Sequence, residues 1–574
     1  MPVSVLRFSE NADPLYIESF TDEESAELKK VITNPESNIF AWKIGDNLNP
    51  EQAGALLSRY SRTALTGKKL FLKEFLPNKN RGREFFESWL VDYGDDSIQE
   101  MAGGIPLSCE FVSNLAVKEI EDNRIGSYIE KSSRYVFFDK KLPDNEYMFY
   151  KDPDIMASRY ADEYVSLLHS LFESYVRNTP LMIKYIKEKN PFESQSFRVG
   201  DSTLKVSELD KEAEERHGVS AADLERSYEN AVKANALDFV RDYLPMATLT
   251  HVGISMNARS YDGMLNKMMA SPLAEARWIA GSIHKELEKL VPSLVKRIGE
   301  KHGIEYRKFL SEKNAEIRDY IRSISKNTEA KKAVPNGVAL ADFTGKEDKD
   351  PNGKAQAILA GMIIYRFSDG NSVSQSIEAA RSMGSEEREA IIAKYMGRRG
   401  NRRHKPGRAF ENIEYLFDLS GRVGIYRDIQ RHRIGTQERQ NFTVKLGYDT
   451  RKEYIEIGIE DDYESKMKEV IALFNKLSEK LPYQAQYVVT YGFYINWYYR
   501  MNARELFHLC ELRSGFGGHP DYRKMAQEMY FRVKDVHPTV ASHMHFMNLQ
   551  DKQLGRLESE IRIAQKKKAL SSGA

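Results

Sequence analysis

Short sequences from the first half of this 574-residue chain recur, in the same order, in its second half. ALLSRYSR near Tyr60 corresponds to GMIIYRFSD near Phe367, and DNRIGS at 122–127 corresponds to RHRIGT at 431–436. A third pair consists of MNARSYDGMLNKM at 256–268 and MNARELFHLCELR at 501–513. Ordered matches of this kind predict two copies of one structural unit.

The length of the chain also favours two domains, because it exceeds what one hydrophobic core usually supports. We expect an α+β fold in which each copy is a sheet flanked by helices and the copies form a pseudo-dimer. The expected domains are 1–310, with an insertion near 150–225 where the first copy is longer, and 330–574. Residues 311–329 are expected to connect them.

Local patterns predict several elements. A helix is expected from the Ser220 cap to Pro245, and a second over 462–482, because both show caps or apolar residues at helical spacing. The alternating stretches SRYVFF (133–138) and EYIEIGIE (453–460) predict strands. Gly435 is expected to stop a helix, and the turn-rich stretch 326–354 is expected to be a linker and loop.

Composition narrows the class of protein. The formal charge is +1 with 41% hydrophobic residues, which is typical of a folded protein and not of a polyanion-binding one. Two cysteines, Cys109 and Cys510, cannot build a disulfide framework or a cysteine-rich zinc site, and we expect no metal. The N-terminus does not resemble a signal peptide, and we expect a cytoplasmic protein without a membrane span.

Two clusters could bind an anion. Ser132 and Arg134 would share one face of a strand and clamp a phosphate, unless they lie on a solvated strand edge. The run Arg431-His432-Arg433 could do the same, although cations also gather at ordinary helix C-termini. The basic stretch 398–408 is expected to be a charged loop; a nucleic-acid-binding role is disfavoured, since the stretch lacks interleaved aromatic residues.

In the second copy, Glu411, Arg431-His432-Arg433, Asn502-Ala503-Arg504 and Arg513 follow one another in order. This set resembles the flavin-dependent thymidylate synthases (the ThyX family), whose signature is RHRxxSxNExSxRY, with SxxEH before it and NAR and a late Arg after it. The first copy resembles the same family through four stretches: Ser97-Ile-Gln-Glu100, DNRIGSYIEKSSRY, FVRDYLP and Asn257-Ala258-Arg259.

The resemblance implies a tetramer of α/β subunits that binds FAD and converts dUMP to dTMP, with methylenetetrahydrofolate and NADPH as co-substrates. Arg513 matches the catalytic position, where a cation stabilises the ionised pyrimidine N3. The cofactor contacts that it implies are Arg431, His432, Arg433, Asn502, Ala503, Arg504, His508, Ser97 and Glu130. The substrate contacts that it implies are Asp428, Arg431, Glu130, Lys131, Ser132, Ser133, Arg134, Arg241 and Arg513.

Neither copy carries the whole family pattern, and the departures complement each other. The first has Asp122-Asn123 at the start of the Arg-His-Arg motif and Met268 at the late Arg position. The second has RQNFT at the ExSxR position and Gln486 at the phosphate-binding Arg. We therefore expect one working composite site, in which Arg134 replaces the arginine missing at Thr443.

Two alternatives to this function remain open at this point. Asp428 stands where the family has Gln, so the substrate could be another pyrimidine nucleotide such as UMP. The chain could also be a non-catalytic flavin- or nucleotide-binding protein, although such a protein has little need of Arg513. Because each chain holds two copies, a homodimer would correspond to the family's tetramer.

Overall fold

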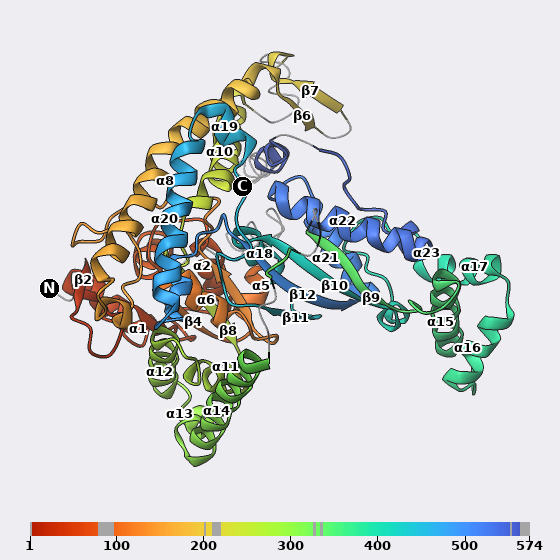
Figure 1. The fold of residues 1–574 in the computed structure, drawn as a ribbon, viewed down its shortest axis with the longest axis horizontal. Helices are drawn as coiled ribbons and strands as arrows, with labels where there is room; N and C mark the ends of the chain where they lie inside the picture. The colour runs from red at the N-terminus through yellow and green to blue at the C-terminus, as the bar shows by residue number, and fades with distance from the viewer. Residues whose placement is uncertain are drawn as a thin grey trace. The chain divides into compact units, whose positions relative to one another are not determined.

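The computed structural model describes residues 3–78, 97–199, 202–208, 220–324, 329–332, 334, 337–551 and 554–562 (Figure 1). The chain divides into two compact units. Unit 1 consists of Met1–Glu329, Tyr448–Phe493 and Leu557–Ala574, and unit 2 consists of Ala330–Gly447 and Tyr494–Arg556. The expected domains, 1–310 and 330–574, follow the sequence copies instead and stay a prediction.

Each unit contains a four-stranded antiparallel sheet, and the two sheets have the same strand order. In unit 1 the order is β3-β4-β8-β5, and in unit 2 it is β9-β10-β12-β11. The bounds in unit 1 are Ile39–Ala41 (β3), Ile105–Ser113 (β4), Leu249–Met256 (β8) and Ser127–Glu130 (β5). Those in unit 2 are Val338–Phe343 (β9), Glu414–Arg422 (β10), Tyr494–Asn502 (β12) and Thr436–Arg439 (β11). The shared order agrees with the predicted duplication and with the α+β fold.

The third sequence match lies at an equivalent strand-to-helix junction in both sheets. Strand β8 is followed directly by helix α11 (Ala258–Met269), and β12 by α21 (Ala503–Arg513). Asn257 and Asn502 are the N-caps, and each side chain accepts a hydrogen bond from the backbone N–H three residues later. An Asn cap satisfies one of the free N–H groups at the start of a helix, which explains why the Asn-Ala-Arg motif begins there.

Unit 1 is rich in helices. Besides α11 they are α1 (Asp22–Val31), α2 (Pro50–Tyr60), α3 (Gly67–Leu70), α5 (Ser97–Ala102), α6 (Asn114–Ile120), α7 (Pro153–Met156), α8 (Ala161–Lys189), α10 (Ala221–Val240), α12 (Ala274–Glu288), α13 (Pro292–Gly299), α14 (Lys301–Ile324), α19 (Lys452–Ile457) and α20 (Glu460–Ser478). Two hairpins complete the unit: β1 (Val3–Leu6) with β2 (Leu15–Ser19), and β6 (Ser196–Val199) with β7 (Ser202–Lys205). Trp42, Leu57 and Tyr60 belong to a buried cluster formed by residues from α1, α2, β3 and their neighbours.

Unit 2 has fewer helices. They are α15 (Pro351–Phe367), α16 (Val373–Ser382), α17 (Ser385–Met396), α18 (Val423–Ile429), α22 (Pro520–Val536) and α23 (Pro538–Ser542), together with α21. Helices α15, α16 and α17 gather at one end of the unit (Figure 1). Strand β10 pairs with β12 from Glu414 opposite Asn502 to Arg422 opposite Tyr494, and buried Tyr415, Phe417 and Leu419 alternate along it.

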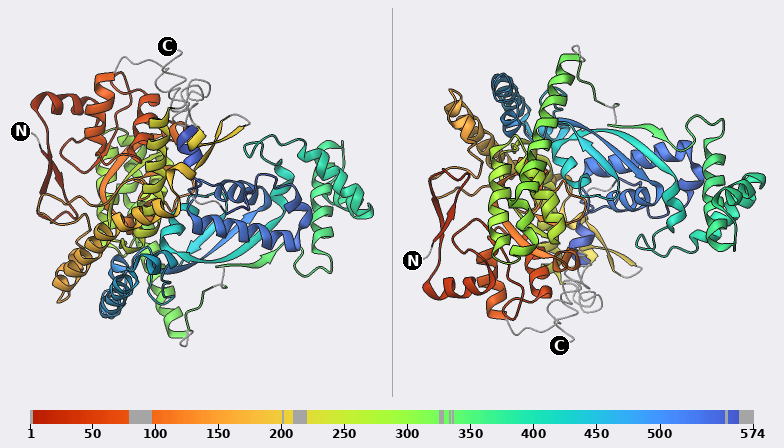
Figure 2. Two further views of the ribbon diagram at one scale, coloured as in Figure 1. Left: turned by 90° about the horizontal axis from the view of Figure 1, so that it is seen from above. Right: turned by 90° about the horizontal axis from the view of Figure 1, so that it is seen from below.

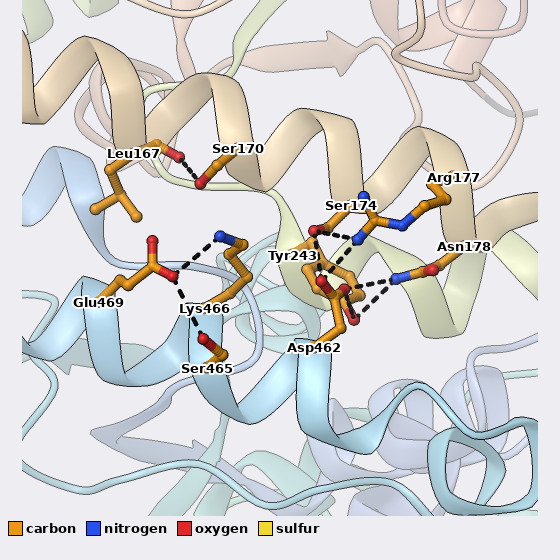
Figure 3. A network of polar contacts seen from close by, with 10 residues as sticks. All are labelled: Leu167, Ser170, Ser174, Arg177, Asn178, Tyr243, Asp462, Ser465, Lys466 and Glu469. Carbon is orange, nitrogen blue, oxygen red and sulfur yellow. Dashed lines mark hydrogen bonds and ion pairs between the residues drawn. The ribbon is translucent and has the colours of Figure 1, made fainter.

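Helix α20 comes from the second sequence copy but packs on α8 of the first, inside unit 1 (Figures 1 and 3). The Asp462 carboxylate is the centre of the contact. It accepts hydrogen bonds from Ser174 Oγ (3.2 Å), Arg177 Nη2 (2.6 Å), Asn178 Nδ2 (2.9 Å) and Tyr243 Oη (3.0 Å). Four donors converge on this one carboxylate, so Asp462 fixes where α20 docks on α8.

The helices expected near 220–245 and 462–482 are confirmed. Helix α10 begins after the Ser220 cap, and α20 buries Val470, Leu473, Phe474 and Leu477 on one face. Both expected strands are wrong. Residues 133–138 form turns and irregular structure, because the backbone N–H groups of Tyr135 and Val136 both donate to the Ser132 carbonyl. The stretch 453–460 lies mostly in helix α19. Its apolar residues alternate over too short a length to distinguish a strand from a helix, and Tyr454 is the buried residue of α19.

Two further expectations need correction. Helix α18 ends at Ile429 with Gln430 as its C-cap, so Gly435 is not its stop. A Cβ at Gly435 would lie 2.2 Å from Tyr499, so this glycine is required by close packing against β12. The stretch expected to be a linker contains β9, an edge strand paired with β10. Among the residues that the structure describes, no helix is both long and apolar enough to cross a membrane.

Replacing Asp462 with Ala should lower the free energy of unfolding by about 2 kcal/mol, because four donors lose their acceptor. Urea denaturation followed by far-UV circular dichroism would measure the loss. Asp461→Ala is the matched control: Asp461 is exposed in the same first turn of α20, so it reports the helix-dipole contribution alone, about 0.5 kcal/mol. Equal losses in both variants would contradict the assigned role of Asp462.

Candidate functional site

The site residues expected from the sequence fall into two groups, one in each unit. Unit 2 holds the Arg-His-Arg run, the Asn-Ala-Arg motif and Arg513, and unit 1 holds residues 130–134 and Arg241. Each group is described within its own unit.

In unit 2, the Arg-His-Arg run follows the last residue of α18 and is fixed through its backbone. The His432 carbonyl accepts hydrogen bonds from Tyr499 Oη (2.7 Å) and Gln437 Nε2 (2.8 Å). Gln437 Nε2 also donates to the Gln430 carbonyl at 3.0 Å. Strands β11 and β12, which carry Gln437 and Tyr499, therefore determine the course of the run.

The His432 side chain lies between two residues of α21. Arg513 Nε donates to His432 Nε2 at 2.8 Å, and His432 Nδ1 lies 3.2 Å from Glu505 Oε1. An arginine Nε–H can only donate, so Nε2 is the acceptor of a neutral ring and Nδ1–H donates to Glu505. Glu505 and Arg513 are eight residues apart, about 12 Å along the helix, and the imidazole connects them.

Burial sets the charges of this group. It lowers the pKa of His432 well below the usual 6.5, and the electrostatic influence of Arg513, His508 and Arg433 lowers it further. Burial also raises the pKa of Glu505 to about 7, against the lowering influence of Lys405 and Arg504. At neutral pH the imidazole is therefore uncharged, and the run Arg431-His432-Arg433 supplies two cations and not three.

The remaining predicted residues of unit 2 lie around this group or support it. The His508 ring centroid is 5.3 Å from that of His432. Arg431, Arg433 and Asp428 are partly exposed, whereas Ala503 is buried at the start of α21. Arg504 donates from Nε to the Pro406 carbonyl and from Nη1 to Glu411, each at 2.9 Å. Arg504 therefore holds the 406–411 segment in place. Glu411 and Arg504, which belong to the same family pattern in the sequence, are in direct contact.

The basic stretch 398–408 contributes less free charge than its composition suggests. Arg399 is buried and donates from both terminal nitrogens to Glu511, at 2.7 and 2.5 Å. Its guanidinium also lies over the rings of Phe507 and Phe546. This arginine is a packing anchor for α21, and it is unavailable to an external phosphate.

In unit 1, two arginines connect the segment after β5 to the end of α10. Arg134 donates from Nε and Nη2 to the two carboxylate oxygens of Asp238, both at 2.5 Å. Arg241 Nη1 donates to Ser133 Oγ at 3.3 Å, and Arg241 is buried. The structure thus brings together Ser133, Arg134 and Arg241, three of the residues expected to bind the substrate. It gives Arg134 an internal carboxylate as a partner, and its contact with a phosphate stays a prediction.

Three other predicted residues of unit 1 make internal contacts. Glu130 is buried beside Lys118, with 3.5 Å between Oε2 and Nζ. Lys131 points inward: its Nζ donates to the carbonyls of Ala64 and Leu65 and lies 3.4 Å from His251 Nδ1. Burial lowers the pKa of Lys131 to about 8. Ser132 Oγ accepts from the Arg134 backbone N–H at 3.3 Å, and the Ser97 side chain lies outside the described residues.

Sequence reasoning missed two carboxylates, Glu505 and Asp238. Glu505 stands three residues after the Asn502 cap, a spacing that is typical of a helix-capping pair. The spacing gives no sign of the contact between Glu505 and His432. Asp238 lies 104 residues from Arg134 in the chain, and its only local signal is its place one turn before Arg241.

Comparison with known proteins gives two findings. A family model described as thymidylate synthase complementing protein matches residues 46–293 and 348–539, one region in each copy. A protein of Chlamydia muridarum named only as a UPF0159 protein is 33% identical over 565 residues, which cover 95% of this chain and 98% of that protein. UPF0159 proteins of Chlamydia pneumoniae and Thermoplasma acidophilum are 32% and 31% identical, over 95% and 89% of this chain and 98% of each relative.

The raised pKa of Glu505 makes a stability prediction. The folded state holds this proton more tightly than the unfolded state, whose carboxyl has a pKa near 4.5. The stabilisation is therefore full below about pH 4.5 and is lost as the pH rises through 7, at most about 3 kcal/mol. Glu505→Gln should remove this part of the pH dependence, as measured by urea denaturation at pH 5 and pH 8.

Glu438→Gln is the control, because Glu438 is exposed on β11 and its substitution should leave the pH dependence of the wild type unchanged. If Glu505→Gln followed the same pH profile as the wild type, Glu505 would not be the protonated partner of His432.

Proposed function

The chain belongs to the family of thymidylate synthase complementing proteins, in a tandemly duplicated form, and on this basis we propose that it is a flavin-dependent thymidylate synthase. The proposed reaction is the reductive methylation of dUMP to dTMP, with methylenetetrahydrofolate as the carbon donor and NADPH as the reductant. We further propose that it acts in the cytoplasm as a homodimer.

The observation that best supports this proposal is the fixed position of Arg513. Its Nε is held by the neutral His432, which is itself held by Glu505, so the guanidinium cannot swing freely. A preorganised cation stabilises negative charge that develops in the transition state better than a mobile one does. Arg513 would stabilise the negative charge of the pyrimidine ring as N3 ionises, which makes C5 nucleophilic.

The donor set of unit 2 fits an anionic cofactor. Arg431, Arg433 and His508 surround a buried ring that adds no charge, and we propose that these side chains hold FAD. When bound, the flavin would supply the hydride. Asn502, Ala503 and Arg504 would act mainly by placing α21 and the 406–411 segment, while Ser97 and Glu130 remain proposed contacts from unit 1.

For the nucleotide, we propose that Arg241 and Arg134 bind the phosphate of dUMP, with Ser132 and Ser133 as hydroxyl donors. Asp238 would orient Arg134 by holding its Nε and Nη2, so that a phosphate is met by a fixed guanidinium. Lys131, whose Nζ points to internal carbonyls, would contribute through its backbone or its field and not through a direct ion pair.

We propose one composite site because the two groups are chemically incomplete alone. Unit 1 offers phosphate-binding arginines but has buried Met268 at the late Arg position. The second sequence copy offers Arg513 and the cations for the cofactor, but it has Gln486, which lies in unit 1, at its phosphate-binding position. A reciprocal site would combine the position of Met268 with that of Gln486. It would lack both essential arginines and would be inactive.

A second candidate is favoured by Asp428, which stands where the family has Gln. A carboxylate only accepts hydrogen bonds, whereas an amide both donates and accepts, so Asp428 would favour a nucleotide that offers a further donor, such as the 2′-hydroxyl by which UMP differs from dUMP. A related pyrimidine nucleotide such as UMP is the alternative substrate, and Asp428→Gln should shift the preference toward dUMP if this is correct.

Binding measurements test the composite site. Purified protein should be yellow, and dUMP should perturb its flavin absorbance. Arg241→Gln should retain the flavin spectrum and lose at least about tenfold in dUMP affinity, because an arginine–phosphate contact is removed. Gln486→Ala, the equivalent position of the second copy, should leave the affinity for dUMP unchanged. Equal losses in both variants, or a colourless protein that FAD cannot reconstitute, would refute the proposal.

The catalytic role of Arg513 has its own test. Arg513→Lys keeps the positive charge but loses the donation to His432, so kcat should fall by about 100-fold or more while the flavin spectrum persists. Met268→Leu, at the equivalent position of the first copy, should leave kcat near the wild-type value. Formation of dTMP from dUMP, followed by chromatography, is the measurement; an unchanged kcat in Arg513→Lys would exclude the role.

A further inference from the structure

Helix α14 of unit 1 exposes a stripe of large apolar side chains. Tyr306, Phe309, Ile317, Tyr320, Ile321 and Ile324 are each between 47% and 61% exposed. Gly303, in the first turn, is buried, and almost all later residues of the helix are exposed. In Figure 2 the last turns of α14, in light green beside the grey trace, extend beyond α11 and α13. Continuous apolar stripes of this kind mark interaction surfaces.

The rotation of α14 is fixed by two arginines on a neighbouring face of the helix. Arg307 Nη1 donates to the Ile298 carbonyl (2.6 Å) and to Asn266 Oδ1 (3.2 Å). Arg318, three turns further, places its guanidinium 4.5 Å from the ring centroid of Tyr483. Because residues eleven apart lie on one face of a helix, both arginines face the body of unit 1. The centre of the apolar stripe lies about 110° around the helix from these arginines, so the stripe occupies a separate face, which is exposed.

The stripe has the spacing of a coiled-coil seam. Tyr306, Leu310, Lys313, Ile317, Tyr320 and Ile324 are separated by alternating steps of four and three residues. This is the heptad pattern by which two helices pack their side chains against each other. A third face of α14 carries the ion pairs Lys301–Glu305 and Lys308–Glu312. The helix therefore has an apolar face, a face with the two arginines and a charged face.

We propose that this seam is covered by α14 of a second copy of the chain, in an antiparallel two-helix coiled coil about a two-fold axis. Two-fold dimers are the commonest protein oligomers, and a stripe of this kind can be self-complementary. The proposal rests on α14 alone and is independent of the proposed catalytic function.

Charge selects the antiparallel arrangement. In a parallel pair, Lys313 would face Lys313 of the partner subunit inside the seam, where two like charges are unfavourable. In an antiparallel pair centred near Ala315, Lys313 faces Ile317 of the partner subunit and lies beside Glu316 of the partner subunit. The two lysines and two glutamates then alternate in sign around the axis.

Sedimentation of the full chain at micromolar concentration tests the association. The wild type should have twice the 66.0 kDa of one chain, and Ile317→Glu with Tyr320→Glu should return it to one chain. Both positions are exposed within one chain, so the far-UV circular dichroism spectrum should not change. A monomeric wild type, or a dimer that persists in the double variant, would overturn the proposal.

A charge exchange tests the arrangement without altering the apolar residues. Lys313→Glu should weaken the dimer at least tenfold, because four carboxylates would meet at the axis. Adding Glu316→Lys should restore it, since the alternation of sign is recovered with the charges reversed. A loss that the second substitution does not rescue would contradict the antiparallel seam.

Cysteine cross-linking distinguishes the two directions. Lys313→Cys and Ile317→Cys, made on separate chains carrying different tags and mixed, should form a mixed disulfide, whereas Ile317→Cys alone should not. The native Cys109 and Cys510 are buried and should not interfere. Cross-linking of Ile317→Cys alone would indicate a parallel pair, and flotation of a monomeric chain with anionic phospholipid vesicles would indicate a membrane surface; either result would overturn the proposal.

Discussion

The uncharged state of His432 is the condition on which the arrangement in unit 2 depends. A protonated imidazole would offer two donors, and Arg513 Nε–H, which can only donate, would lose its acceptor. Burial among cations keeps the ring neutral, and the same burial makes Glu505 hold a proton near neutral pH. The resulting chain of hydrogen bonds orders a guanidinium without neutralising it by a carboxylate. An arginine that is held in place and still fully charged suits the stabilisation of a developing anion.

The two units share the same connection between sheet and helix but place different side chains on the helix. Asn257 and Asn502 both cap a helix at the end of a central strand, and the strand orders of the two sheets agree. The two helices differ about three turns after the cap. At that position α11 carries buried Met268 and α21 carries Arg513. Duplication preserved the backbone junction, and the side chains further along each helix diverged.

Sequence reasoning predicted the duplication, the family and the capped helices, because these depend on local or ordered signals. Ser220 and its partner Asp223 are three residues apart, so the start of α10 was visible in the sequence. The course of 133–138 was not visible, because Arg134 is held by Asp238 from a distant helix. The alternating apolar residues of 453–458 predicted a strand. A stretch this short is equally compatible with a short helix that buries one residue, as α19 does. Glu505 was overlooked because its spacing from Asn502 already had an explanation.

The assignment of residues 448–493 to unit 1 has a consequence for biosynthesis. Unit 1 is assembled from three separate stretches of chain, and the last of them begins at Leu557. During translation, α8 emerges from the ribosome some 270 residues before α20, which carries Asp462, its main polar partner. The face of α8 that α20 covers therefore stays uncovered until α20 has been synthesised. Such a chain depends on slow-forming, long-range contacts, and its nascent form is a natural client for molecular chaperones.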